Sequence, residues 1–510
     1  MSACVIRFAL ICLLSVLWID LLPATEPLSI GTRRELFVDD ALVDRLSGEA
    51  EIRLQNPVPR EVVFRFDQPW EGSSSGYHTI IQDGDLYRLY YRGTHIEVSQ
   101  GRINTGSHKP YYCYAESKDG IHWTRPELGI VEFQGSKQNN IILEGLGTHN
   151  FAPFKDENPE CKPEARFKAL AGLQNEGGLH AFQSADGIHW KRMQEKAVLT
   201  KGAFDSQNLA FWDEDHKTYR TYFRVFTGGV TNSKTWKPEG IRAIQTATSD
   251  DFLNWSEGID LVYTDSPDEE LYTNQVKPYL RAPHIRIGFP ARYVERGWSE
   301  SMRALPDPER RQLRASSVER YGTAISEGLL MASRDGVHFK RWNEAFLRPG
   351  IERTGTWQYG HQFIAEHLVE TASDLPGAPN ELSLYAAEDY WHGKGGALRR
   401  YSLRMDGFTS VHASLKGGEM ITQPFVFSGK TLSVNFATSA AGSLWVELQT
   451  ADGKPIEGFS LADSVELFGD TLDRKVTWKE GADLSALAGK PVRLRFKLKD
   501  ADLYSFQFQE

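Results

Sequence analysis

A seven-residue motif recurs along this chain and restricts the possible folds more than any other feature. The motif "SKDGIHW" spans 117–123, and close copies are "SADGIHW" at 184–190, "SDDFLNW" at 249–255 and "SRDGVHF" at 333–339, with a weaker copy, "RMDGFTSV", at 404–411. The aromatic anchors Trp123, Trp190, Trp255, Phe339 and Phe408 are 67, 65, 84 and 69 residues apart. A long, nearly regular period indicates one supersecondary unit stacked upon itself.

Each copy follows two runs in which apolar and polar residues alternate, as in "DLYRLYYRG" and "YYCYAES" before the first copy. Alternation marks half-buried strands, and Asp-Gly followed by an aromatic residue indicates a tight turn packed against its sheet. We expect four-stranded blades, and five units predict an all-β, five-bladed β-propeller, because ring closure protects the sheet edges. The segment from Leu36 to about Phe66 is expected to supply the outer strand of the last blade. A pair of β-sandwiches remains the alternative.

Both ends of the chain differ from this array. Residues 1–25 contain one basic residue and an apolar run from Phe8 to Ile19, which is too short to span a bilayer. This pattern predicts a signal peptide, and therefore a secreted or periplasmic protein, with a buried N-terminal helix as the alternative. Residues 26–411 are assigned to the propeller. Residues 412–510 alternate without the motif and predict a small C-terminal β-sandwich.

Composition narrows the classes of partner. The net charge of −10 over 510 residues argues against nucleic acid or an anionic membrane as the main partner. Cys4 and Cys12 lie in the leader, so Cys113 and Cys161 are left either to form one disulfide or to remain free thiols. Neither a zinc nor a calcium motif is present, so no metal or other cofactor is predicted, although a cation on the propeller axis remains open.

The blade pattern Y-x-x-Y followed by A-x-S-x-D-G-x-x-W resembles that of glycoside hydrolase families 32, 43 and 68, with the related families 117 and 130. The stretch "PWEGSSSGYHTIIQDGDLYRLYYRG" looks like their first blade, and Leu36 to Phe508 resembles a group of secreted planctomycete proteins described as family-32-like. This resemblance implies a five-bladed propeller that acts on glycosidic bonds. The family-32 patterns N-D-P-N-G and R-D-P are absent, so no catalytic residue is carried over. Asp119, Asp186 and Asp335 of the repeats are interpreted as turn formers.

In propellers of this type the ligand lies on the axis, where innermost strands begin and second strands end. That rule selects a set of polar and aromatic side chains from all five units. The predicted substrate-binding residues are Tyr77, His78, Arg92, His149, Asn150, Gln207, Asn208, Arg224, Tyr272, Asn274, Arg292 and His361.

Glycoside hydrolysis ordinarily requires two carboxyl groups. Asp205, in "KGAFDSQNLAFWD", is the first candidate. Glu388, in "SLYAAEDYWHG", is the second, because an acid within an aromatic stretch can have a raised pKa; a salt bridge to one of the arginines predicted at the axis is the alternative. Glu71 is a possible replacement for Glu388. His149 and His361 are alternative general acids, or else structural residues.

The three arginines at equivalent strand ends, Arg92, Arg224 and Arg292, favour a carboxylate or sulfate ligand if they converge. Pairing with carboxylates of neighbouring blades is the alternative. Aromatic residues near the axis suit stacking on sugar rings: Trp70, Tyr77, Tyr272, Trp357 and Trp391. The leading hypothesis is therefore a glycoside hydrolase for an anionic (uronic or sulfated) polysaccharide or oligosaccharide. A family-130-like phosphorylase and a non-catalytic carbohydrate-binding propeller are the alternatives.

Overall fold

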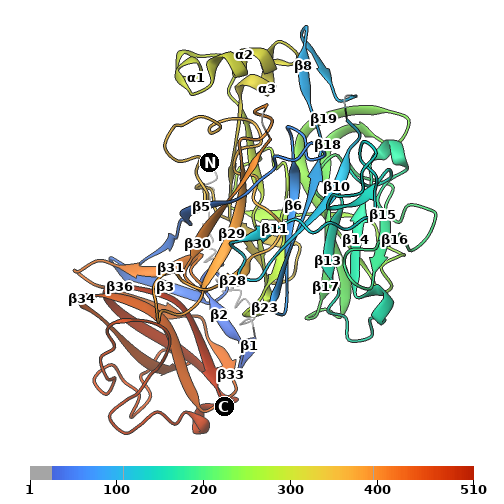
Figure 1. Ribbon diagram of the computed structural model, residues 1–510. Helices are drawn as coiled ribbons and strands as arrows, with labels where there is room; N and C mark the ends of the chain where they lie inside the picture. The colour runs from blue at the N-terminus through green and yellow to red at the C-terminus, as the bar shows by residue number, and fades with distance from the viewer. Residues whose placement is uncertain (1–25, 107, 394) are drawn as a thin grey trace, which may run out of the picture.

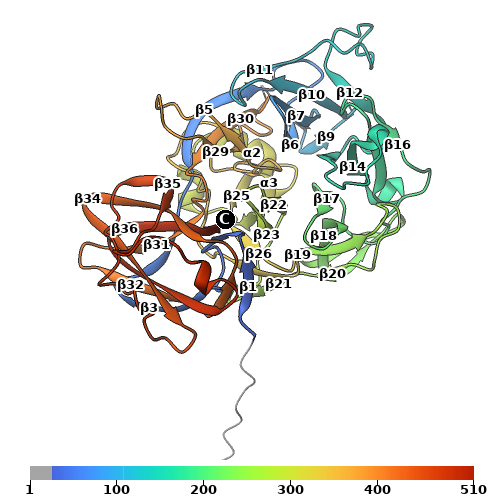
Figure 2. The same ribbon diagram turned by 90° about the horizontal axis from the view of Figure 1, so that it is seen from below.

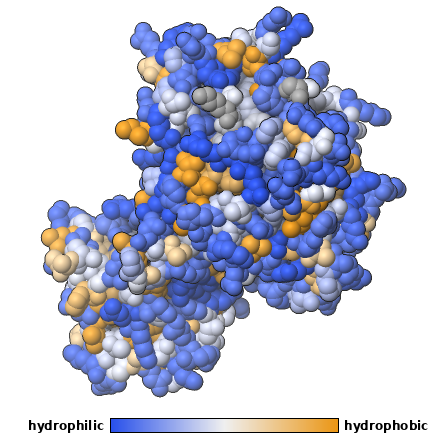
Figure 3. Space-filling model, in the orientation of Figure 1, coloured by the Kyte–Doolittle hydropathy of each residue, from blue (hydrophilic) through white to orange (hydrophobic). Residues whose placement is uncertain are grey.

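The computed structural model describes residues 26–106, 108–393 and 395–510, of which β-strands are the main component at 48%. The predicted signal peptide, together with Cys4 and Cys12, lies outside the described residues. In this part of the chain no helix is long and apolar enough to cross a membrane. The face in Figure 3 is largely hydrophilic, and its hydrophobic residues form small scattered groups.

Five sheets of four or five strands follow one another along the chain and lie around a ring in Figure 2. The first contains β6 (Gly76–Asp83), β7 (Leu86–Gly93), β10 (Tyr111–Ser117), β11 (Trp123–Thr124) and β12 (Ile141–Glu144). The second contains β13 (Ala152–Lys155), β14 (Phe167–Ala171), β15 (His180–Ser184) and β16 (Lys191–Arg192). The third contains β17 (Leu209–Asp213), β18 (Thr218–Thr231), β19 (Trp236–Ser249) and β20 (Ile259–Asp260).

The fourth sheet contains β22 (Lys277–Tyr279), β23 (Ala282–Gly288), β26 (Met331–Ser333), β27 (His338–Arg341) and β21 (Val262–Thr264). The fifth contains β28 (Val369–Thr371), β29 (Glu381–Glu388), β30 (Ala397–Leu403) and β5 (Val58–Arg65). β5 pairs antiparallel with β30. A strand from the start of the chain therefore completes the last sheet, as predicted for this segment.

The innermost strands of these sheets surround one axis. A cavity of about 360 Å³ is lined by residues from these strands or their immediate ends, namely Ile81, Lys155, Phe211, Lys277 and Leu368. Across the axis, Lys277 forms a 2.9 Å ion pair with the buried Glu366, which accepts a hydrogen bond from Thr79 at 3.1 Å. A buried ion pair is favourable only when the remaining polar groups of both partners are hydrogen-bonded. Here the ion pair and the hydrogen bond join residues of three sheets.

The repeated motif forms the same turn in four places. Asp119 Oδ1 accepts hydrogen bonds from the backbone N–H groups of Ile121 and His122, both at 2.8 Å, and Trp123 donates its indole N–H to the Gly120 carbonyl at 3.1 Å. Asp186, Asp251 and Asp335 accept equivalent backbone bonds. The prediction that these aspartates are turn formers is confirmed, since their carboxylates are committed to the backbone.

Tyrosines of the neighbouring sheets bond to the carbonyls of these turns. Tyr90 in the first sheet donates to the Gly187 carbonyl of the second at 3.0 Å, and Tyr222 in the third donates to Gly336 at 2.9 Å. Tyr385 in the fifth sheet donates to Gly120 in the first at 2.7 Å. The motif and the preceding tyrosine pattern are thus two halves of one contact between sheets, which explains their joint repetition.

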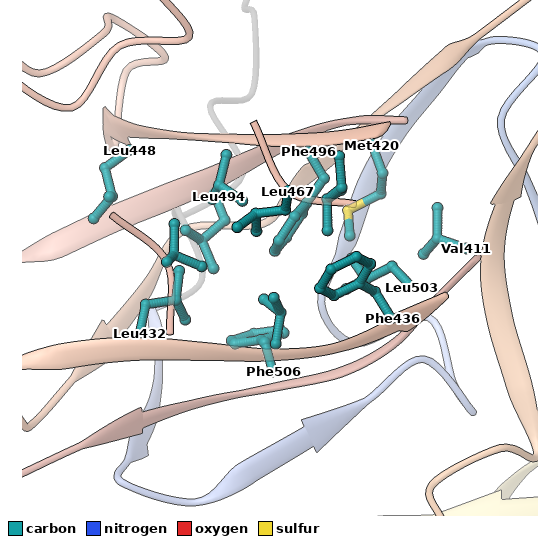
Figure 4. Packing of buried hydrophobic residues seen from close by; sticks show 14 of the residues in the cluster. Val411, Met420, Leu432, Phe436, Leu448, Leu467, Leu494, Phe496, Leu503 and Phe506 are labelled. Atoms are coloured by element: carbon teal, nitrogen blue, oxygen red, sulfur yellow. The ribbon is translucent and has the colours of Figure 1, made fainter. Parts of the chain in front are cut away.

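A ten-stranded sheet forms the separate body at the lower left of Figure 1. It contains β1 (Leu28–Gly31), β2 (Arg34–Leu36), β3 (Val43–Gly48), β4 (Glu51–Leu54), β31 (Thr409–Ala413), β32 (Gly418–Thr422), β33 (Phe425–Phe427), β34 (Thr431–Thr450), β35 (Asp470–Lys475) and β36 (Pro491–Gln509). Phe436, Phe496 and Phe506 are among the side chains that meet in its core (Figure 4).

The predicted domain boundary at residue 26 needs correction, because strands within residues 28–54 pair with the C-terminal strands. β2 pairs with β36, β3 with β32 and β4 with β31. Only the part of the segment from Leu36 to Phe66 that forms β5 joins the last sheet. Alternation predicts strands but does not identify their partners, which here lie some 350 residues or more further along the chain.

Two smaller features lie over one end of the ring in Figure 1. One is the hairpin of β8 (Glu97–Ser99) and β9 (Arg102–Asn104). The other is an insertion between β24 (Ala291–Glu295) and β25 (Ala324–Gly328), which carries α1 (Glu300–Ala304), α2 (Pro308–Ala315) and α3 (Glu319–Thr323). Cys113 and Cys161 are free thiols, so the alternative without a disulfide holds.

Candidate active site

Asp205 and His149 form a contact pair at the beginnings of the second and third sheets. The loops that precede β13 and β17 present these side chains, and His149 Nε2 lies 2.8 Å from Asp205 Oδ1. The Asp205 side chain is 45% exposed and that of His149 is 29% exposed. Both side chains are therefore accessible to a ligand, unlike most of the other predicted site residues.

Two buried arginines lie next to this pair. Arg92, near the end of β7, places Nη1 3.3 Å from His149 Nε2 and donates to the Ser74 carbonyl and to the Tyr390 hydroxyl, both at 3.3 Å. Arg224, in β18, lies 3.7 Å from Asp205 Oδ2. Positive charge from two sheets therefore converges on one exposed carboxylate.

These neighbours determine the charge on Asp205. Partial removal of this carboxyl from water by itself raises its pKa, but the hydrogen bond from His149 and the charges of His149, Arg224 and Arg92 lower the pKa below its ordinary value. Asp205 is thus a carboxylate at neutral pH. An ionised carboxylate only accepts hydrogen bonds, so the 2.8 Å contact requires the proton to be on His149 Nε2.

Tyrosine rings surround this group. Arg92 lies over the Tyr77 ring at 4.6 Å, and Arg224 lies over the Tyr272 ring at 5.2 Å. The Tyr272 and Tyr359 hydroxyl groups are 2.8 Å apart. Tyr77 has a φ of 51°, which is rare for a bulky residue. Strained backbone of this kind is often found at functional sites.

The predicted amides form hydrogen bonds inside the protein instead of facing solvent. Asn150 donates to three carbonyls, those of Gly172, Phe204 and Ser206, and Asn208 donates to two of the same carbonyls. Gln207 bonds to Thr79 and Gln275 on the axis, and Asn274 donates to the carbonyls of Gln207 and Tyr222. All four amides are at most 1% exposed. They hold the strand beginnings that carry Asp205, so they support the site without lining it.

His78 and His361 are also buried. His78 stacks on Phe66, and His361 Nδ1 accepts a hydrogen bond from the Trp357 backbone at 3.1 Å. Burial lowers the pKa of each imidazole to about 3. His361 is therefore neutral and inaccessible, which contradicts the alternative that it is a general acid.

Glu388 does not have the raised pKa that its aromatic surroundings suggested. The carboxylate is 2% exposed and is paired with Arg399 at 2.7 Å and with Arg353. Burial raises its pKa, but these two arginines outweigh burial and lower the pKa overall. The prediction of a salt bridge is correct but its partners are not the predicted arginines, because Glu388 at the end of β29 lies diagonally across the ladder from Arg399 in β30.

We expect Glu388→Gln to destabilise the fold without a specific loss of catalysis. Removing this charge leaves two guanidinium groups unpaired around a buried amide, which should cost about 2 kcal/mol of unfolding free energy. Urea denaturation monitored by fluorescence would measure this cost. A variant of unchanged stability that had lost all activity would contradict the structural role and restore Glu388 as a catalytic candidate.

Glu71 and Arg292 are likewise bonded to residues outside the predicted site. Glu71 is fully buried, and it accepts hydrogen bonds from Tyr91 at 2.5 Å and from Arg125 at 2.8 Å; burial raises its pKa despite these partners. Arg292 pairs with Glu327 and Glu269. β23 ends at Gly288, so Arg292 belongs to the β24–β25 ladder and not to a second-strand end. The spacing of residues in the sequence does not indicate that the strand ends between Gly288 and Ala291.

Of the aromatic residues predicted at the axis, Trp70 and Trp357 lie elsewhere, and Trp391 is buried beside the tyrosines of the site. Trp70 packs against Phe133 and donates to Asn140, and Trp391 is buried in a cluster with Tyr359 and Tyr390. Trp357 lines a separate cavity. Tyr359 and Tyr390 were missed, although the "EDYW" stretch placed Tyr390 two residues beyond the Glu388 candidate. Among the described residues no group of three or more His, Cys, Asp or Glu side chains could hold a metal ion.

Comparisons with known proteins give only distant similarities. No family model matches the chain. Two proteins of Mycobacterium tuberculosis described as uncharacterized are 22% identical over 162 residues, or 30% of this chain, and the chain spans about half of their length (46%). The likeness to planctomycete proteins stays a prediction.

Solved structures with partial similarity include several carbohydrate-active enzymes. A thermostable family-43 glycoside hydrolase has 14% identity and a TM-score of 0.41, and covers 68% of this chain and 95% of its own. An N-acetylgalactosamine deacetylase from F. plautii has 12% identity and a TM-score of 0.41 over 69% and 94%. A family-43 arabinoxylan arabinofuranohydrolase from Bacillus subtilis has 10% identity and a TM-score of 0.30 over 89% and 99%. Similarities this weak transfer neither residue roles nor substrates to this chain.

Proposed function

We propose that this protein is an exported, five-bladed β-propeller glycoside hydrolase with an appended β-sandwich, and that it cleaves an anionic polysaccharide or oligosaccharide. The observation that carries the proposal is the group at the axis: an exposed, ionised Asp205 in contact with His149 and flanked by Arg92 and Arg224. Perturbed ionisable residues of this kind cluster at functional sites.

The pair supplies both proton transfers of hydrolysis. Asp205 Oδ2 accepts a proton from water as the water oxygen bonds to the anomeric carbon. The bond from that carbon to the leaving oxygen breaks, and protonated His149 donates a proton from Nδ1 to that oxygen. His149 Nε2–H stays bonded to Asp205 Oδ1, so the two proposed transfers use the other atoms of the pair, His149 Nδ1 and Asp205 Oδ2.

The two arginines select the substrate class. Guanidinium groups recognise carboxylate and sulfate through forked hydrogen bonds, and Tyr77 and Tyr272 provide faces for a sugar ring. A uronic or sulfated unit next to Asp205 would place its acid group against Arg92 or Arg224. The substrate is therefore an acidic glycan outside the cell, reached after cleavage of the predicted leader.

A phosphorylase is the second candidate, and one observation favours it. Glu71 and Glu388 are both buried in ion pairs, which leaves Asp205 as the only one of the three predicted catalytic carboxylates that is accessible. Phosphorolysis needs no carboxylate to activate water, because phosphate itself attacks the anomeric carbon, and two arginines would hold that phosphate. A binding protein without catalysis is the third possibility.

The test is a substrate panel assayed with and without inorganic phosphate. Purified protein is incubated with neutral, uronic and sulfated polysaccharides, and new reducing ends and sugar phosphates are measured. We expect reducing ends from an acidic glycan without phosphate. Sugar phosphates formed only with phosphate would replace hydrolysis by phosphorolysis. Binding of an acidic glycan without any product would replace the enzyme by a binding protein.

A further inference from the structure

A second cavity, separate from the Asp205 group, lies against the inserted helices. Its volume is about 450 Å³. It is enclosed by the β24–β25 ladder, by α1 with the loop before it, and by the segment that contains Pro349, Glu352 and Trp357. Apolar walls from Val294, Met302, Leu305 and Ile325 accompany polar groups on Ser301, Arg296, Glu327 and Glu352. An aromatic face with a few polar groups is the usual composition of a small-ligand site.

Trp357 is held in the wall of this cavity by three hydrogen bonds. Its indole N–H donates to the Gly350 carbonyl at 2.8 Å, its backbone N–H donates to His361 at 3.1 Å, and its carbonyl accepts from Arg311 at 2.6 Å. Its φ is 56°, a conformation that is an outlier for a bulky side chain. The ring nevertheless stays partly exposed. A partly exposed aromatic side chain, held on a strained and hydrogen-bonded backbone, indicates a place where a ligand binds.

The polar groups of the cavity are suited to hydroxyl donors. Glu327 Oε1 accepts both hydrogen bonds from Arg292, at 2.8 and 2.6 Å, so its other oxygen is left for a further donor. Glu352 is exposed at the same wall. Glu327 is neutralised by Arg292, and Glu352 and Arg296 contribute one charge of each sign. The lining therefore leaves no net positive charge for an acid group.

The segment that carries Trp357 also reaches the Asp205 group. Tyr359, two residues further on, bonds through its hydroxyl to Tyr272, whose ring contacts Arg224. Arg224 in turn lies beside Asp205. The cavity and the proposed catalytic centre are thus the two sides of one short segment of chain.

We propose that this cavity is a binding subsite for an uncharged sugar unit, which stacks on Trp357 and donates its hydroxyl hydrogens to Glu327 and Glu352. Because the segment 357–359 contacts both the cavity and the tyrosines beside Arg224, we expect the preferred glycan to contain neutral as well as acidic sugars. The inference rests on the proposed function only for this expected composition. Binding of a neutral sugar at Trp357 requires no turnover.

The test measures binding of neutral disaccharides in the Asp205→Asn background, so that nothing is consumed. Xylobiose, arabinobiose and galactobiose are compared with digalacturonate by saturation-transfer NMR. Trp357→Asn removes the ring while keeping the left-handed backbone, which asparagine tolerates, and Trp357→Phe keeps a stacking face. Trp445→Asn, at a partly exposed tryptophan of the ten-stranded sheet, is the matched control, and circular dichroism monitors folding.

At least one neutral disaccharide is expected to bind, with its Kd raised about tenfold or more by Trp357→Asn and about threefold by Glu352→Gln, while the Trp445 control and digalacturonate binding stay unchanged. Retention of most binding by Trp357→Phe would support stacking. Failure of every neutral disaccharide to bind, or equal Kd values with and without Trp357→Asn in the Asp205→Asn background, would overturn the subsite. Neutral-sugar binding that depends on Trp357, in a protein that cleaves no glycan, would uphold the subsite and refute the hydrolase.

Discussion

Asp205→Asn is expected to lower kcat/KM on an acidic glycan by roughly a thousandfold, the usual contribution of a general acid or base. Asparagine keeps an oxygen that accepts the His149 N–H, but it cannot take a proton from water. Because Asp205 is 45% exposed, the unfolding free energy should change by no more than about 1 kcal/mol. Steady-state kinetics and urea denaturation of the same preparation measure the two effects.

The pH profile gives an independent check on this residue. The pKa of Asp205 is held below its ordinary value, so the carboxylate stays ionised as the pH falls toward about 4, and kcat/KM should decline on the acid side only below that pH. Asp119→Asn serves as the control, because Asp119 forms a turn and is not part of the proposed site. This variant should keep kcat/KM within a few-fold of the wild-type value. Activity of the Asp205→Asn protein near the wild-type level would remove Asp205 from the mechanism.

Asp406→Asn is expected to destabilise the protein by about 3–5 kcal/mol, the cost of removing one partner from a buried charge network. Asp406 is fully buried between the fourth sheet and the ten-stranded sheet. Its carboxylate accepts hydrogen bonds from Tyr279 at 2.8 Å, Ser505 at 2.6 Å and Arg281 at 3.1 Å, and it pairs with Arg34 at 3.4 Å. The substitution removes the nearest counter-charge of Arg34 and of Arg281. Asparagine tolerates the φ of 64°, so backbone strain adds little.

The matched control is Asp40→Asn, which breaks an exposed pair with Lys340 at the same seam. Asp40 is 66% exposed, so this change should cost less than about 1 kcal/mol. Guanidinium denaturation of both variants would give the comparison. Equal unfolding midpoints for the two variants would mean that Asp406 does not hold the ten-stranded sheet against the fourth sheet.

Much of the strand pattern could be predicted because its cause is local. The Ser-x-Asp-Gly turn satisfies its own backbone N–H groups within seven residues, and alternation reports which face of a strand is buried. The weaker fifth copy shows the limit of this signal. Asp406 bonds to residues distant in the sequence instead of its own turn, and the residues next to it do not indicate these partners.

The candidate site was only partly predictable for the same reason. Innermost strands begin, and second strands end, at the same end of the axis, and this rule can be applied to a sequence. It brings together Asp205, His149, Arg92 and Arg224. Glu388 does lie at a second-strand end and yet bonds to Arg399, whereas Arg292 lies beyond the end of β23 and bonds to Glu327. A carboxylate acquires its partner and its pKa from contacts across sheets, which depend on the direction of each side chain.

The sequence by itself determined the repeated blade unit, its turns and most of the strands, because each depends on interactions within a few residues. Tertiary structure alone decided three things: that residues 28–54 complete the C-terminal sheet, that Asp205 is the accessible carboxylate, and that Trp357 lines a cavity of its own. These outcomes depend on pairing over hundreds of residues. Hydrogen-bond and charge partners at such distances are chosen by packing of the whole chain, which no local pattern records.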